Sequence, residues 1–150
     1  MLVFTDVTEQ DAVFLFEVFK DTRMDEFIPM NMPEEQLDML MHMQFRAQQM
    51  SYQSQYPSAS HQIIEIHHRQ AGYIITDRQD DQIRLVFIAL LPDFRNQGYG
   101  TSILEQLQQT ASFIMLQVAE QNPARQLYRK LGFTEQGQSP PYVAMQWQRQ

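Results

Sequence analysis

The first third of the chain combines a short apolar segment with two stretches of helical periodicity. Residues 1–7 predict a short strand. Thr8 precedes Asp11 by three residues, a spacing typical of the capping box at a helix start, with Asp in the usual place of Glu or Gln. We therefore expect a first helix from Thr8 to about Phe19.

A second helix is predicted to begin near Asn31 and Pro33, because proline is tolerated in the first helical turn. Apolar side chains then recur at helical spacing to about Met50. The residues that carry this pattern are Leu37, Leu40, Met41 and Phe45. The polar stretch 52–60 is expected to connect this helix to the next element.

From His61 onward the pattern becomes typical of strands. The predicted strands are HQIIEIHH (61–68), GYIITD (72–77) and IRLVFIALL (83–91), joined by the polar turns RQAG and RQDDQ. Such tight turns favour antiparallel hairpins. The third segment is apolar on both alternations, which predicts a central strand buried on both faces.

Two helices and three strands are predicted in the remaining residues. A helix is expected from Gly98 to about Thr110, and a buried strand at 112–118. A compact helix follows within NPARQLYRKLGF, where Asn122 is the expected cap, Pro123 takes the first turn and Gly132 supplies the exit. The last two strands are expected at 132–136 and 141–147.

The order β-α-α-β-β-β-α-β-α-β-β predicts one domain over residues 1–150. We expect an α/β (α+β) fold in which a mixed sheet carries helices on both faces. The composition, 43% hydrophobic and 19% charged, is that of an ordinary soluble globular protein.

The charge of the chain is concentrated at one end. The net charge is −7, and residues 1–50 hold ten acidic and three basic side chains, whereas the rest hold eight of each. The excess is either a set of solvated helix faces or a negative rim that attracts cations. No basic stripe is present, so we predict no nucleic-acid partner.

Several classes of protein are disfavoured by what the sequence lacks. The absence of cysteine rules out disulfides and thiolate chemistry and fits a reducing cytoplasm, where we expect the protein. No apolar run approaches the ~20 residues of a membrane span, and we expect neither a signal peptide nor a membrane partner. We also predict no metal site: of His42, His61, His67 and His68, the adjacent pair would point to opposite faces of a strand.

Two of the five glycines, Gly98 and Gly100, stand one residue apart between the predicted central strand and the next helix. The first N–H groups of a helix lack partners within it and carry partial positive charge, which makes a helix start an anion site. Glycine lets the backbone come close to such a ligand. Arg95 adds a cation and Thr101 a hydroxyl, so the segment suits a pyrophosphate.

The glycine pair fits neither of two familiar nucleotide motifs. The Walker pattern is absent, and the dinucleotide pattern G-x-G-x-x-G fails at its third glycine, where Ile103 stands. By itself, the pair is compatible with a phosphate or nucleotide site or with close packing at a helix start.

Two segments together resemble a known family. Arg95-x-x-Gly98-x-Gly100, after Leu90-Leu91-Pro92, resembles the acyl-CoA signature of the GNAT acetyltransferase superfamily. Asn122-Pro-Ala-x-x-Leu-Tyr128-x-x-x-Gly132-Phe133 resembles that family's second signature. The two occur in the family's order and separation. The resemblance covers the whole chain and implies a GNAT-like, mostly antiparallel sheet of about seven strands flanked by about four helices.

The resemblance also implies an acyl-CoA site. Amides of the glycine turn would hold the pyrophosphate, and the strand before it would bind the pantetheine where two strands part. Tyr128 would be the general acid that protonates the CoA thiolate, since a phenol with a pKa near ~10 keeps its proton at neutral pH. Asn122 would contact the pantetheine or serve only as a cap. The implied CoA-binding residues are Ile88, Ala89, Leu90, Arg95, Gln97, Gly98, Tyr99, Gly100, Thr101, Asn122 and Tyr128.

The general base is where the sequence departs from the family pattern. Many GNAT enzymes carry a Glu on the strand before the glycine turn, about where Phe87 stands here. Glu120 is the candidate replacement near the mouth of the site, and Glu65 and His67 are the other candidates. Deprotonation through water would also serve, because proximity and orientation alone supply up to ~7–11 kcal/mol.

These features predict an N-acetyltransferase that moves an acetyl group from acetyl-CoA to a primary amine of a small molecule or peptide. The acidic first third favours a cationic acceptor. The missing Glu leaves open a non-catalytic acyl-CoA-binding sensor or regulatory module. We also expect a homodimer, from the resemblance and the exposed final strands.

Overall fold

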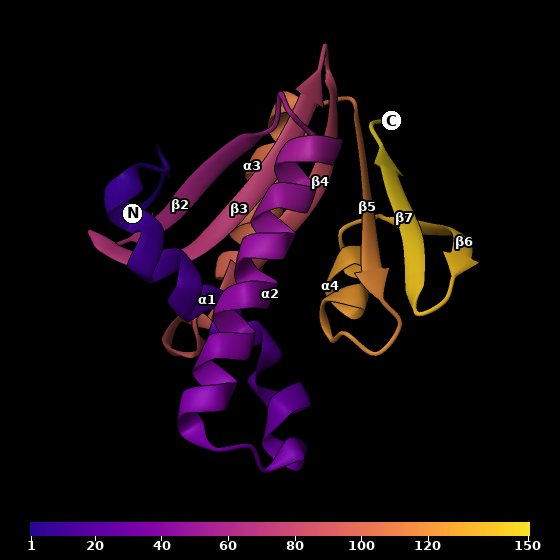
Figure 1. The fold of residues 1–150 in the computed structure, drawn as a ribbon. Helices are drawn as coiled ribbons and strands as arrows, with labels where there is room; N and C mark the ends of the chain where they lie inside the picture. The colour runs from indigo at the N-terminus through magenta and orange to yellow at the C-terminus, as the bar shows by residue number, and fades with distance from the viewer.

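A computed structural model describes residues 1–150, and its elements follow the predicted order (Figure 1). The helices are α1 (Ala12–Phe27), α2 (Glu34–Gln55), α3 (Tyr99–Thr110) and α4 (Ala124–Lys130). The strands are β1 (Leu2–Asp6), β2 (Ser60–Ile66), β3 (Arg69–Gln79), β4 (Gln82–Leu90), β5 (Phe113–Ala119), β6 (Thr134–Ser139) and β7 (Tyr142–Gln148). None of the helices is both long enough and apolar enough to cross a membrane.

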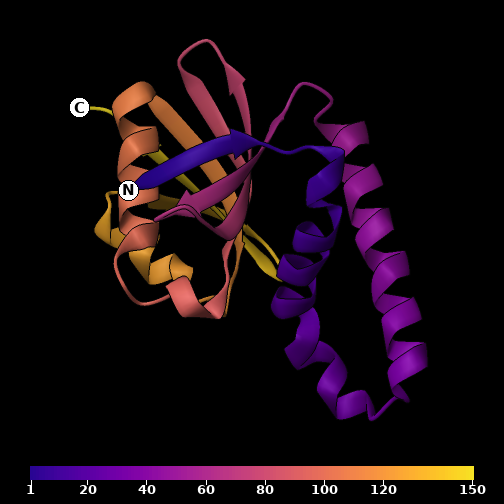
Figure 2. The same ribbon diagram turned by 90° about the vertical axis from the view of Figure 1, so that its left-hand side faces the viewer.

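The seven strands form one sheet in the order β1-β2-β3-β4-β5-β7-β6. Only β4 and β5 pair in parallel, and every other neighbouring pair is antiparallel. Figure 2 shows α1 and α2 on one side of the sheet and α3 and α4 on the other. The predicted mixed, mostly antiparallel α+β fold is confirmed.

The core divides by the alternation of side chains along each strand. Ile64 and Ile74 belong to a cluster of 18 buried residues on the side of α3 and α4. Their neighbours Ile63 and Ile75 belong to a cluster of six with residues of α1. Successive strand residues face opposite sides of a sheet, so this period places a separate apolar core on each face.

Both helices of the first third are longer than predicted. α1 continues to Phe27 and α2 to Gln55, because the two helices pack on each other beyond the edge of the sheet. Phe19, Phe27 and Met41 form a third buried cluster there. Asn31, expected near the start of the second helix, instead adopts a left-handed conformation (φ 50°) in the connection.

The turn between β2 and β3 also differs from the prediction. His67 and His68 form it themselves, with φ of 51° and 66°, and RQAG lies within β3. The two histidines therefore do not occupy opposite faces of a strand. Gly72 sits inside β3 because a Cβ there would lie 2.2 Å from the Ala89 carbonyl oxygen.

The predicted helix start at Thr8 is confirmed in part. The Asp11 carboxylate accepts a hydrogen bond from the Thr8 main-chain N–H at 2.8 Å, and the Thr8 side chain faces the Asp11 main-chain N–H in return, so the predicted capping box is present. The turn that it caps is a short 3₁₀ segment, Glu9–Asp11, and α1 begins only after it.

Candidate functional site

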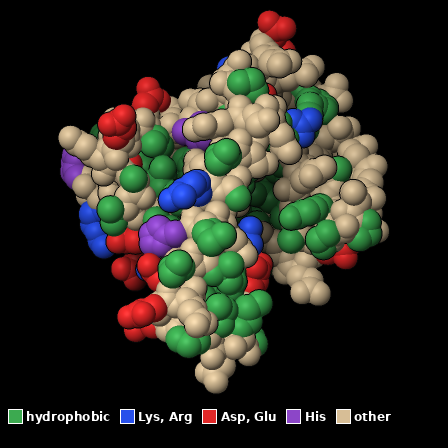
Figure 3. Space-filling view, viewed as in Figure 1, with side chains coloured by type: hydrophobic (Ala, Val, Ile, Leu, Met, Phe, Trp, Pro, Cys, Tyr) green, Lys and Arg blue, Asp and Glu red, His purple; other side chains and the backbone are tan.

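The parallel pair at the centre of the sheet is short, and the two strands then separate. β4 pairs with β5 only from Gln82 to Leu85. Beyond that point β4 remains bound to β3 and β5 to β7, so a gap opens between them. Figure 3 shows a hollow on this face, surrounded by hydrophobic side chains.

A β-bulge at Val86 marks the point of separation. Leu85 lies opposite Thr76, and Phe87 lies opposite the adjacent residue Ile75, so Val86 has no partner in β3. Bulges bend a strand and increase its twist. The bulge therefore explains why β4 leaves β5 within a single residue of their last pair.

The main-chain groups of β4 alternate between β3 and the gap. The Leu91 N–H donates to the Ala71 carbonyl at 2.8 Å, so the register directs the groups of Ala89 toward β3 as well. Those of Ile88 and Leu90 face the gap. Of the three β4 residues predicted to bind pantetheine, Ile88 thus turns both main-chain groups toward the gap, whereas Leu90 offers only its N–H because its carbonyl accepts from Arg95 Nε.

The two glycines at the start of α3 are required for different structural reasons. Gly98 has φ +86° and open space around its Cβ position, so backbone conformation requires it. A Cβ on Gly100 would lie 3.2 Å from Leu127 Cδ2, so close packing of α3 on α4 requires it. Together they bring the start of α3 close to α4, which carries Tyr128.

The turn between Asn96 and Thr101 presents a row of free amides. No main-chain N–H in this segment donates a hydrogen bond within the protein, and the first helical bond of α3 runs from Ser102 N to Gly98 O at 3.1 Å. Positive φ at Asn96 and Gly98 curls the segment. Consecutive free N–H groups at a helix start form an anion-binding concavity.

The side chains of this turn are held by the protein itself. Arg95 Nε donates to the Leu90 carbonyl at 2.8 Å, and its guanidinium forms an ion pair with Asp21 of α1. Gln97 Nε2 donates to the Asp93 carbonyl at 2.6 Å. The amides, rather than the Arg95 cation, are thus the free donors here. The contact with Asp21 was not predictable from local sequence, because Asp21 lies on α1.

Tyr128 is buried against Phe133, with their ring centroids 5.6 Å apart. Its hydroxyl makes no hydrogen bond within the protein. Burial raises the pKa of Tyr128 to about 12, so the phenol is protonated at neutral pH. The predicted general acid therefore has a proton and no competing partner, although its catalytic role stays a prediction.

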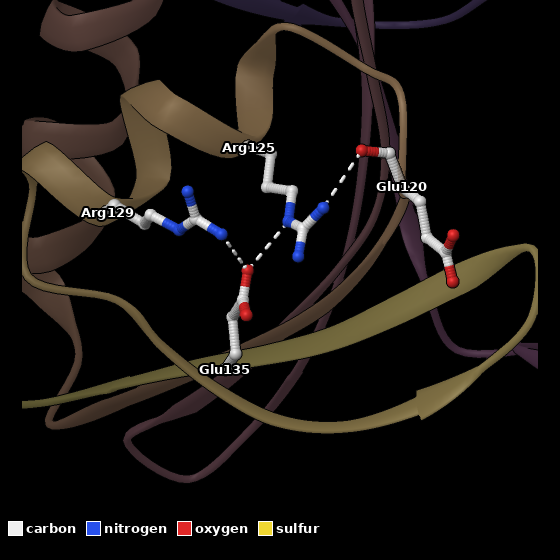
Figure 4. Close-up of polar contacts among 4 residues, drawn as sticks. All are labelled: Glu120, Arg125, Arg129 and Glu135. Atoms are coloured by element: carbon white, nitrogen blue, oxygen red, sulfur yellow. Dashed lines mark hydrogen bonds and ion pairs between the residues drawn. The ribbon is translucent and has the colours of Figure 1, made fainter.

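A charged cluster fastens α4 to β6 (Figure 4). The Glu135 carboxylate accepts from Arg125 Nε at 2.6 Å and from Arg129 Nη2 at 2.5 Å. Arg125 also donates to the Glu120 carbonyl at 3.0 Å. Arg125 first, and then Arg129, lowers the pKa of Glu135 to about 2. Sequence inspection missed this cluster, whose carboxylate lies on another element.

Asn122 acts as a helix cap. Its Oδ1 accepts a hydrogen bond from the Ala124 N–H at 2.9 Å, at the start of α4. Pro123 lies between them in helical conformation, as predicted for the first turn. The proposed contact of Asn122 with pantetheine stays a prediction.

The candidate bases lie in different places. The Glu120 carboxylate follows β5 beside the gap, makes no hydrogen bond within the protein, and points away from the arginines in Figure 4. Glu65, on β2, accepts a hydrogen bond from Thr5 of β1, and His67, in the turn between β2 and β3, contacts the N-terminal amine. β3 lies between Glu65 and β4, and His67 is bonded on the side of β1, so of the three candidates only Glu120 lies beside the gap.

An aromatic wall stands where the family's acidic residue is missing. The Phe87 ring lies 5.4 Å from the ring of Tyr73 and 6.3 Å from that of Tyr52 on α2. The wall offers apolar contact beside the gap.

No group of three His, Cys, Asp or Glu side chains is placed to hold a metal ion.

Comparison with known proteins agrees with this geometry. The family model of the acetyltransferase (GNAT) domain matches residues 57–135. None of the curated proteins compared matches the sequence significantly. The chain belongs to the GNAT acetyltransferase family, whose enzymes use acetyl-CoA.

Solved structures share the fold over nearly the whole chain at low identity. The PaiA N-acetyltransferase of Thermoplasma acidophilum, in complex with coenzyme A, has a TM-score of 0.71 and 14% identity, covering 99% of both chains. The ribosomal-protein-S18-alanine N-acetyltransferase of Escherichia coli has 0.60 and 18%, covering 99% of this chain and 94% of that one. A chimera of the spermidine N-acetyltransferase SpeG from Vibrio cholerae with hSSAT has a TM-score of 0.66 and 16% identity, covering 98% of this chain and 95% of that one.

Proposed function

We propose that the protein transfers an acetyl group from acetyl-CoA directly to a primary amine. The observation that carries this proposal is the row of free amides at Asn96–Thr101, at the end of a strand that has left its neighbour. A diphosphate at the amides and a pantetheine along Ile88 and Leu90 would direct the thioester toward α4. A coenzyme A complex of a protein with this fold supports the choice of donor.

The amine releases two protons and the thiolate takes one. A cationic acceptor first loses a proton to Glu120, directly or through water, and its neutral nitrogen then attacks the acetyl carbon. As the carbon–sulfur bond breaks, the thiolate takes a proton from the Tyr128 hydroxyl, and the second proton of the nitrogen leaves through water and restores that hydroxyl. Tyr128 suits the role of proton donor because it is protonated and unpaired.

The acceptor is proposed to be cationic before reaction, because the negative charge of the chain lies in the part that contains α1 and α2. Relatives of this fold are named for an alanine amine and for spermidine, which are both amines. An oligomer that forms through the exposed strand β6 is compatible with this function.

A second candidate function is an acyl-CoA-binding module without catalysis, favoured by the aromatic residue Phe87 where many family members carry an acid. Turnover separates the two. Purified protein is incubated with acetyl-CoA and a panel of polyamines, amino acids and peptides with free N-termini, and thiol release is recorded. We expect release with at least one amine. CoA binding without release from any amine would favour the binding module.

A further inference from the structure

A pocket separate from the gap lies between the two N-terminal helices and the sheet. It has a volume of about 500 Å³ and is lined by Leu15 of α1, Gln49 of α2, and His61 and Tyr73 of β2 and β3. Val7, Pro57 and Ala59 give it further apolar surface. Figure 1 shows α1 and β2 on one side of α2 and β5 on the other, so the pocket and the region where β4 and β5 separate lie on different sides of that helix.

The floor of the pocket is a hydrogen-bonded pair. The Tyr73 hydroxyl lies 2.5 Å from His61 Nδ1. Burial raises the pKa of Tyr73 to about 12 and lowers the pKa of His61, so the phenol keeps its proton and the imidazole is neutral. The hydroxyl is then the donor to Nδ1, which places the imidazole proton on Nε2. Nε2 makes no hydrogen bond within the protein.

Gln49 adds a second unused donor. Its Nε2 is buried and meets no acceptor with hydrogen-bond geometry. The Tyr73 hydroxyl is a group that the amide could donate to, and this approach lowers the pKa of that tyrosine against the larger effect of burial, but the Tyr73 hydroxyl and the Gln49 amide do not form a hydrogen bond by geometry. A buried N–H without an acceptor destabilises the folded protein. A protein tolerates such a cost most readily where a ligand removes it, and the group lines an open pocket.

The chemistry of the lining restricts the ligand. Two neutral donors, His61 Nε2–H and Gln49 Nε2–H, call for an acceptor oxygen. No charged side chain lines the pocket, and the protein as a whole carries a charge of −7, which disfavours a carboxylate or phosphate. The apolar walls call for a hydrocarbon body.

We propose that this pocket binds a small uncharged molecule through a carbonyl oxygen, at a site distinct from the acetyl-CoA gap. Gln49 and His61 donate to the carbonyl, and Leu15, Val7 and Ala59 contact the apolar body. The site does not depend on acetyl transfer.

Benzamide is the probe, and benzoate is its matched control, because the two have the same shape and differ in charge. Binding is followed by the NMR signals of the Gln49 side-chain amide and the His61 ring, with the protein saturated with CoA. We expect a dissociation constant in the millimolar range, usual for so few heavy atoms, and binding of benzoate at least tenfold weaker. Equal binding of both, shifts at other residues only, or displacement of CoA by benzamide would overturn the proposal.

Two variants test the donor. Gln49→Leu removes it at similar volume, and Gln55→Leu makes the same change on an exposed part of α2 outside the pocket. We expect Gln49→Leu to weaken benzamide about tenfold while raising the melting temperature of the free protein by about 2–4 °C, because it removes a buried unpaired group. Gln55→Leu should change neither. A lower melting temperature for Gln49→Leu with unchanged benzamide binding would show a purely structural glutamine and would contradict the proposal.

Discussion

The two helical layers of the molecule differ in how many apolar side chains they bury against the sheet and against each other. The layer of α3 and α4 shares one cluster of 18 buried residues with the sheet, whereas the layer of α1 and α2 has clusters of six and three. Most large exposed apolar side chains belong to the second layer and its flanks: Val13, Ile28, Met30, Met39, Met43 and Met50. The tightly packed layer holds the proposed donor site.

The difference in packing matches the different requirements of the two substrates of an acyl transfer, the acyl donor and the acceptor. A donor that is the same in every reaction suits a preorganised backbone site, and α3 and α4 supply it through the Gly100–Leu127 contact and the Glu135 cluster. Flexible methionines suit a surface that adapts. The comparison predicts that mutations in the α3 and α4 layer, which holds the proposed acetyl-CoA site, lower activity or stability. Mutations on the outer surface of α2 should change either quantity only slightly.

The largest expected effect is on catalysis. Tyr128→Phe removes the hydroxyl and keeps the packing against Phe133. We expect kcat to fall by about 10²–10⁴, as for loss of a general acid, with CoA affinity within about twofold. Steady-state kinetics with an accepted amine and calorimetry with CoA measure both. An unchanged kcat would remove Tyr128 from the mechanism.

Packing between α3 and α4 comes next. Gly100→Leu drives a side chain into Leu127, and we expect a loss of about 1–3 kcal/mol in unfolding free energy together with weaker CoA binding. Gly137→Leu is the matched control, because no atom lies within 4 Å of its Cβ position. Urea unfolding compares the two. Equal losses of unfolding free energy in the two variants would show that the close contact between Gly100 and Leu127 does not cause the destabilisation.

The Glu135 cluster predicts a smaller, pH-dependent effect. Its arginines depress the pKa of Glu135 from 4.5 to about 2, so the carboxylate stabilises the fold above pH 4.5, and this stability is lost as the pH falls toward 2. Wild-type unfolding free energy should therefore decline more steeply than that of Glu135→Gln across this window. The effect should shrink in high salt because the group is exposed to solvent. Parallel curves for the two proteins would contradict it.

The smallest effect is expected on the outer surface of α2. Met43 is 63% exposed, so Met43→Ala should change the unfolding free energy by no more than about 0.5 kcal/mol. Met41, two residues earlier, is 1% exposed, and Met41→Ala should cost about 2–5 kcal/mol. Thermal unfolding of the pair measures the contrast. Similar losses would mean that the exposed methionines are structurally required.

Local signals made most of the donor side predictable. Short segments of sequence predicted the glycine turn, the Asn122 cap and the strand order. The turn and the cap follow from the backbone conformations that glycine, asparagine and proline favour, and the strands follow from the spacing of apolar residues. The paired positive φ values of His67 and His68 were not predictable, because histidine seldom takes that conformation. The Arg95–Asp21 and Arg125–Glu135 pairs join separate elements, so no spacing reveals them. The lengths of α1 and α2 depend on their packing against each other.

The central claim is that unpaired main-chain amides grip the diphosphate of CoA, and amide NMR tests it directly. ¹⁵N-labelled protein is titrated with CoA and, separately, with pantetheine, which lacks the diphosphate. We predict large shifts for the amides from Asn96 to Thr101 with CoA, and shifts with pantetheine confined to the β4 residues around Ile88 and Leu90. CoA binding that leaves the amides of Gly98 and Gly100 unmoved would contradict the account.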